Sequence, residues 1–216
     1  MAKEIHVPFG NFYYEKFSKP IRNKTDFIFL ILDTLNMLDL GNSAYDVKGE
    51  FVIKIDKMSR IFYYLTDKYY SVVFPFSVEK QETSVGKYII YDAESDVVIN
   101  DRLVSLMRGI AEKIDFVNST VENVLEQIYF DTFDDGYSDT DFSKCWNIIW
   151  KLYAAEPGYI RYDYDQIHYN DTFHPLNHLD VNYSAKCTYK LGLRERLRPE
   201  EFINLLDVQK ECRFVV

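Results

Sequence analysis

Three of the four histidines in the chain, His168, His174 and His178, lie in the segment RYDYDQIHYNDTFHPLNHLDVNYS (161–184). The same segment supplies Asp163 and Asp180. Imidazole changes its charge near neutral pH and is a common metal ligand. Histidines clustered with carboxylates therefore indicate a candidate chemical site.

Two kinds of chemistry fit these residue types. Neutral imidazoles with one carboxylate could hold Zn²⁺ or another divalent metal and leave a position open for water. Alternatively, two histidines could act as base and acid in RNA cleavage, with Arg161 stabilising the charge of the phosphorane. The His174–His178 spacing crosses Pro175 and is not a helical i,i+4 pair, so the spacing alone does not indicate a metal. A solvent-exposed polar hairpin without chemistry is the third interpretation.

A period of two in the side chains predicts that this segment forms two strands joined by a loop. The four expected faces are, in order, Arg161, Asp163 and Asp165; Tyr162, Tyr164 and His168; His178, Asp180, Asn182 and Ser184; and Leu179, Val181 and Tyr183. The polar face of the second strand should point at solvent or at a polar site. Pro175 fixes the backbone where the loop 169–177 re-enters the sheet, which places His174 within reach of the other two histidines.

The elements around this segment alternate in blocks. Apolar spacing and capping residues predict helices over 25–40, 100–117, 120–133 and 139–156, and a closing helix that begins at Pro199. Strands are expected over 50–56, 87–99 and from 159 onward, whereas 58–78 fits a helix or a strand. Such segregation favours an α+β fold, an antiparallel sheet with helices packed mainly on one face. A single domain over 1–216 is expected. The alternative is a division into two halves, 1–99 and 100–216.

Composition narrows the function classes. The formal net charge of −9 repels phosphate backbones, so binding to bare DNA is not expected. Three cysteines at wide spacings, without a CxxC pair, fit a reducing cytosol. The N-terminal residues lack the apolar core of a secretory signal, and the apolar segment 27–40 is too short to span a bilayer. A cytoplasmic protein without a P-loop, GxSxG elbow or HExxH zinc helix is therefore expected.

The segments RYDYD, HPLNHLDVN and LRPEEFINLLD together resemble the bacterial family domain of unknown function 2290, which has an HPxxHLxI-like segment and a closing Pro-x-x-Phe helix. A looser similarity connects them to toxins of the TumE type, in which an RYD strand precedes histidine-rich sequence. The first resemblance covers about the last 60 residues well and the rest by element order only. Arg161, Asp163, His174 and His178 match the shared pattern. The similarity to toxins implies an RNA-targeting protein of a bacterial toxin–antitoxin or anti-phage defence locus.

Two hypotheses follow. The first is a toxin-like or defence protein with a histidine-centred site for phosphodiester chemistry on RNA. A divalent metal is the one cofactor considered. The candidate catalytic residues are His174, His178, Arg161, Asp163, His168 and Asp180. The second is a non-catalytic acidic subunit that binds another protein of such a system, encoded by a neighbouring gene. The acidic net charge favours the second hypothesis, because RNA-cleaving proteins benefit from a positive groove.

Overall fold

The computed structural model describes residues 3–40, 46–80, 87–134, 136–183 and 186–212. These residues form an α+β fold, which confirms the expected class. The chain divides into two compact units: unit 1 comprises residues 1–19, 44–74 and 157–216, and unit 2 comprises residues 20–43 and 75–156. The boundary considered between residues 99 and 100 falls inside unit 2.

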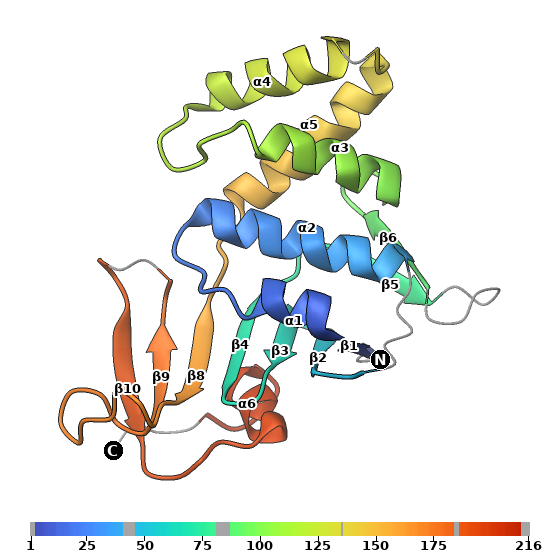
Figure 1. The fold of residues 1–216 in the computed structure, drawn as a ribbon. Coiled ribbons are helices and arrows are strands. Elements are labelled where there is room, and N and C mark those ends of the chain that lie inside the picture. Colours follow the sequence, from blue (N-terminus) through green and yellow to red (C-terminus); the bar gives the residue numbers. More distant parts are fainter. Residues whose placement is uncertain (1–2, 41–45, 81–86, 135, 184–185, 213–216) are drawn as a thin grey trace. The chain divides into compact units, whose positions relative to one another are not determined.

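Unit 1 is built on a seven-stranded antiparallel sheet in the order β1-β2-β3-β4-β8-β9-β10 (Figure 1). Its elements are β1 (Lys3–Phe9), α1 (Asn11–Phe17), β2 (Gly49–Ile55), β3 (Ser59–Tyr64), β4 (Lys68–Val73), β8 (Ile160–Tyr164), β9 (Asn177–Val181), β10 (Tyr189–Leu193) and α6 (Pro199–Leu206). The pairing of β4 with β8 joins strands that lie far apart in the sequence. The segment with the three histidines therefore belongs to a continuous sheet.

Apolar side chains lie on both faces of this sheet. On one face Phe17 of α1 packs against Phe51 and Tyr63. On the other face Phe202 of α6 packs against Phe62, in a cluster that also contains Val52, Tyr162, Leu179 and Leu197. Neighbouring residues of β2 and β3 are apolar, so each strand presents an apolar surface to both sides. The sequence favoured helices mainly on one face, whereas α1 and α6 cover opposite faces in unit 1.

Unit 2 combines four helices with a three-stranded antiparallel sheet. Its elements are α2 (Lys24–Leu40), β5 (Ser77–Lys80), β6 (Tyr88–Asp92), β7 (Val97–Ile99), α3 (Asp101–Ala111), α4 (Val121–Asp134) and α5 (Asp139–Ala154). Asn100 caps α3 by accepting a hydrogen bond from the Leu103 N–H at 3.0 Å, as its position before the apolar run predicted. No helix in the described ranges is long and apolar enough to cross a membrane.

The structure assigns secondary structure to two segments for which the sequence made no definite prediction. The ambiguous segment 58–78 forms the strands β3 and β4 and the start of β5. The N-terminal residues, for which no element was expected, form β1 and α1. Pro8 lies within β1 because this strand is at the edge of the sheet, where a missing N–H donor is tolerated.

Candidate functional site

The register of four strands arranges the polar side chains in two rows on one face of the unit 1 sheet. Residues that pair across antiparallel strands point to the same side. The first row is Lys68, Asp163, His178 and Gly192, and the second is Tyr70, Arg161, Asp180 and Lys190. The expected sharing of faces by Arg161 with Asp163, and by His178 with Asp180, is therefore confirmed.

Arg161 lies between the two carboxylates and binds both. Its Nε donates to Asp163 Oδ2 at 2.7 Å, and its terminal nitrogen donates to Asp180 Oδ2 at 2.5 Å. Burial lowers the pKa of Arg161, but Tyr159, Asp163 and Asp180 outweigh it and raise the pKa above the ordinary value. The guanidinium is thus a permanent cation that orients the two carboxylates, and its donors are directed at them instead of at a phosphate.

His178 is fully buried beside these carboxylates. Its Nδ1 donates to the Pro175 carbonyl at 2.7 Å, and the ammonium of Lys190 lies 2.9 Å from its Nε2. Burial lowers the pKa of His178, and the positive charge of Lys190 lowers it further. The ring is therefore neutral, with its proton on Nδ1 and its Nε2 lone pair directed at Lys190.

Gly192 makes room for the proline that holds this histidine. A Cβ at position 192 would lie 3.0 Å from Pro175 Cγ. Lys190, two residues earlier on β10, also donates to Asp180 Oδ1 at 2.6 Å. We call Arg161, Asp163, His178, Asp180 and Lys190 the buried charged network after its two buried members, His178 and Asp180; Arg161 and Asp163 are partly buried and Lys190 is exposed. Arg161 and Lys190 bring two cationic groups to its two carboxylates.

A second group of polar side chains lies on the segment 165–175, which we call the histidine loop. Asp165 Oδ2 lies 3.0 Å from His168 Nδ1 and 3.1 Å from His174 Nε2. Burial raises the pKa of Asp165, but hydrogen bonds from the N–H groups of His168 and Ile167 and from the His168 ring lower it to about 2. One permanent carboxylate therefore orients two imidazoles.

The ring of His174 lies next to the rings of both other histidines. The ring centroids of His168 and His174 are 6.1 Å apart, and those of His174 and His178 are 4.6 Å apart in an edge-to-face contact. The loop closes on itself through reciprocal backbone hydrogen bonds between Asn170 and His174. The predicted approach of His174 to both other histidines is confirmed. The side chain of His168 is 72% exposed, in contrast to that of His178.

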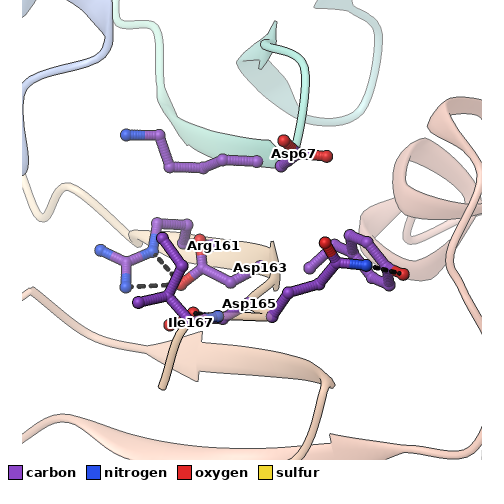
Figure 2. Close-up of a pocket in the computed structure, with 8 residues that line it drawn as sticks. Asp67, Arg161, Asp163, Asp165 and Ile167 are labelled. Atoms are coloured by element: carbon purple, nitrogen blue, oxygen red, sulfur yellow. Dashed lines mark hydrogen bonds and ion pairs between the residues drawn. The ribbon is translucent and has the colours of Figure 1, made fainter. Parts of the chain in front are cut away.

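A hollow of about 430 Å³ adjoins both groups. It is lined by Asp67, Lys68, Arg161, Asp163, Tyr164, Asp165, Gln166 and Ile167 (Figure 2). Figure 2 shows Arg161 and Asp163 on one side of the hollow and Asp67 on the other. Lys68 Nζ donates to the Ser18 carbonyl at 2.6 Å, so this cation is already hydrogen-bonded within unit 1. Three carboxylates and two cationic side chains line the hollow, and both cations are already hydrogen-bonded to protein groups. The lining therefore does not favour binding of a phosphate.

The structure corrects two of the expected positions. Strand β8 ends at Tyr164, so His168 does not share a face with the tyrosines, and its ring contacts Asp165 instead. Strand β9 ends at Val181 because Asn182 has a positive φ of 68°, so Asn182 does not continue the polar face. Ser184 lies outside the described residues. The polar face of β9 is buried, because charges on neighbouring strands satisfy its side chains.

Sequence reasoning missed Lys190 altogether and left Asp165 out of the catalytic set. Lys190 and Gly192 alternate with Tyr189, Leu191 and Leu193 along β10, so a period-two pattern was present. Its meaning depends on the pairing of β10 with β9, which places Lys190 opposite Asp180. Asp165 follows the end of β8, and its role depends on how the histidine loop folds back.

The six candidate residues thus fall into two sets with different capacities. Arg161, Asp163, His178 and Asp180 belong to the buried charged network, where a nitrogen and carboxylate oxygens could hold a metal ion. His168 and His174 belong to the histidine loop, where exposed or partly exposed rings could exchange protons with a ligand.

No protein-family model, curated protein or solved structure matches the chain. The resemblance to the two bacterial families remains a prediction.

Proposed function

We propose that the protein cleaves RNA phosphodiester bonds with His168 and His174 as the base and acid. One observation supports this most strongly: a single carboxylate, Asp165, lies within hydrogen-bond distance of both imidazoles. A carboxylate that binds one ring nitrogen fixes the tautomer, so the opposite nitrogen carries the lone pair of the neutral ring. His168 and His174 would thus act as a base and an acid that the same carboxylate, Asp165, orients.

The chemistry requires RNA. One histidine removes the proton of the ribose 2′-hydroxyl, and the 2′-oxygen attacks the adjacent phosphorus. The other histidine, as imidazolium, protonates the 5′-oxygen that leaves, so the products are a 2′,3′-cyclic phosphate and a 5′-hydroxyl. DNA lacks the 2′-hydroxyl and would not react. Because Arg161 is engaged with Asp163 and Asp180, the imidazolium supplies the positive charge next to the phosphorane.

The histidine loop also carries side chains suited to unpaired bases. Phe173 is 81% exposed and Tyr169 is half exposed, on either side of the bridge between Asn170 and His174. Exposed aromatic rings stack on the bases of single-stranded RNA, and such stacking does not depend on a positive groove. This feature fits a chain with a net charge of −9. We further propose a role in bacterial toxicity or anti-phage defence in the cytoplasm, which is what the expected resemblance to TumE-type toxins implies.

The test compares wild type with His168→Ala and His174→Ala on labelled single-stranded RNA in the presence of EDTA. We expect each variant to lose about 10²–10⁴-fold in cleavage rate, the usual contribution of one acid or base. His6→Ala is the matched control, because His6 is on β1 and is exposed, with Glu50 as its partner. The same sequence with 2′-deoxyribose should remain intact.

Either of two results would refute the proposal. One is cleavage by His168→Ala or His174→Ala at the rate of His6→Ala. The other is the absence of cleavage by folded wild-type protein over a panel of RNA sequences that covers all dinucleotide steps.

A second candidate function is binding to a protein encoded next to it, as a non-catalytic acidic subunit. Ile167 is 88% exposed at the tip region that also presents Phe173, and apolar side chains of this size gathered on one loop are typical of contact surfaces. Co-purification of wild type and an Ile167→Ser/Phe173→Ser variant with the neighbouring gene products tests this candidate. Equal recovery of a partner with both proteins would count against the loop as the binding surface.

A further inference from the structure

The buried charged network presents one nitrogen and two carboxylates to a common point. Atoms of Asp163, His178 and Asp180 that could bind a metal lie within 4.8 Å of one another. His178 Nε2 is 3.7 Å from Asp163 Oδ2 and 4.0 Å from Asp180 Oδ1. Ligands at about 2.0–2.2 Å from a tetrahedral zinc ion are about 3.3–3.6 Å apart. Side-chain movements of up to about 1 Å would therefore close the three side chains around an ion.

His178 is already in the form that a metal requires. Its Nδ1 donates to the Pro175 carbonyl at 2.7 Å, which leaves the Nε2 lone pair free to accept from Lys190 or to bind a metal ion. Histidines that bind metals have this arrangement, in which a carbonyl or carboxylate accepts the second N–H and fixes the ring. The side chain is fully buried, so its orientation is set by packing as well.

The carboxylates are fixed in the same way. Arg161 donates to Asp163 Oδ2 and to Asp180 Oδ2, and Asp180 Oδ1 is left to face His178 and Lys190. A hydrogen-bonded second shell of this kind holds ligating carboxylates in place and is typical of protein metal sites. The three side chains do not form a plain acidic surface cluster, because Arg161 and the Pro175 carbonyl orient them.

A positively charged group contacts two of the three side chains. Lys190 Nζ is 2.9 Å from His178 Nε2 and 2.6 Å from Asp180 Oδ1. The Lys190 side chain is 31% exposed at the surface of β10, so its flexible stem can move the ammonium into solvent without repacking the sheet. The ammonium therefore competes with a metal ion for two of the three ligands, His178 and Asp180.

We propose that Asp163, His178 and Asp180 bind a divalent transition metal ion, and that the ammonium of Lys190 binds two of these ligands, His178 and Asp180, when the ion is not bound. The imidazole ligand favours zinc and its neighbours over Mg²⁺ and Ca²⁺, which prefer oxygen donors alone. Binding exchanges a single positive charge for a double one between two carboxylates. This site is separate from the proton transfers assigned to His168 and His174, and its test does not depend on RNA cleavage.

The experiment measures Zn²⁺ binding by calorimetry to full-length protein that has been stripped of metal with EDTA. Lys190→Ala removes the competing ammonium, and we expect it to bind Zn²⁺ about tenfold more tightly than wild type, because a charge-assisted hydrogen bond no longer has to be broken. Lys57→Ala, which removes an exposed lysine of the same unit, is the matched control and should bind as wild type does. Ca²⁺ should bind at least about tenfold more weakly than Zn²⁺ to Lys190→Ala.

A spectroscopic arm identifies the ligands. Co²⁺ bound to Lys190→Ala should give the intense visible absorption of a tetrahedral site, and adding His178→Gln or Asp180→Asn should remove it. Circular dichroism establishes that each variant is folded, and the Lys190→Ala result is decisive where the buried His178 variant does not fold. Equal Zn²⁺ affinity of Lys190→Ala and Lys57→Ala would overturn the proposal. Equal affinity for Ca²⁺ and Zn²⁺, or cobalt absorption that persists in a folded Asp180→Asn variant, would also overturn it.

Discussion

Replacing Arg161 by methionine separates a structural role of this residue from phosphate binding. The substitution keeps the length of the side chain and removes its charge, so Asp180 keeps only its ion pair with Lys190 and Asp163 loses its arginine partner. Breaking a buried ion pair by removing one partner costs about 3–5 kcal/mol of stability. The Arg161 side chain is 23% exposed, so we expect about 3 kcal/mol, the lower end of that range.

The assay is urea denaturation followed by two signals that report different units. Trp146 and Trp150, the two tryptophans of the chain, are both on α5 of unit 2, so their fluorescence follows unit 2. Far-UV circular dichroism includes the sheet of unit 1 and should register the loss of stability there. Arg194→Met is the matched control: it removes an exposed arginine of unit 1 and should change stability by less than about 0.5 kcal/mol.

A double variant tests the origin of the effect. Adding Asp163→Asn to Arg161→Met removes one of the uncompensated carboxylates, and we expect it to recover about 1–2 kcal/mol of the loss. If Arg161→Met is as stable as Arg194→Met, the guanidinium does not sustain the network. A free phosphate-binding arginine would then be the better interpretation, and the assignment of roles given above would be wrong.

Other properties of the chain give three further predictions. Lys54→Met should lower the free energy of unfolding by about 3–5 kcal/mol, because Lys54 and Asp207 form a buried ion pair at 2.9 Å; Lys54→Met/Asp207→Leu should be more stable than the single variant in the same urea titration. The hydrogen bond from Lys54 lowers the pKa of Asp207, so this stabilisation is present above the unfolded-state pKa of about 3.9 and is lost as the pH falls through the folded-state value; Asp207→Asn should flatten the fall of the unfolding midpoint between about pH 5 and 3. Burial raises the pKa of Cys145 to about 12, so a thiol reagent should modify Cys187 and Cys212 in the folded protein and Cys145 only in denaturant.

Local signals in the sequence predicted most of the elements. The Asn100 cap and the apolar spacing after it are contained in one short segment, and α3 begins where they predict. The alternation of Arg161 with Asp163 and of His178 with Asp180 similarly gave two strands with the correct faces. Such features depend on neighbours in the chain, which a single sequence displays directly.

Features that depend on distant partners were not predictable in the same way. Ile5, Val7 and Phe9 alternate as in a strand, but Pro8 weakens that signal and the partner strand β2 is far along the chain. Likewise, the polar face of β9 was expected at solvent or at a polar site, and its burial depends on Lys190 of β10. One sequence does not reveal which charged side chains will pair across strands. The pairing of Lys190 with Asp180, which compensates for the burial of the polar face of β9, was therefore missed.

The division of unit 1 into separated segments also has a consequence for protein synthesis. Strands β1 to β4 leave the ribosome first. Strand β8, which pairs with β4, is synthesised only after residues 75–156 of unit 2, which lie between the two strands in the sequence. At about 5–20 residues per second, β4 waits roughly 4–16 s for its neighbour. During this interval its edge is an unpaired row of N–H and C=O groups that can pair with another nascent chain. A chain released just after residue 156 would therefore contain all of unit 2 but only four of the seven strands of the unit 1 sheet, with β4 as an exposed edge prone to aggregation.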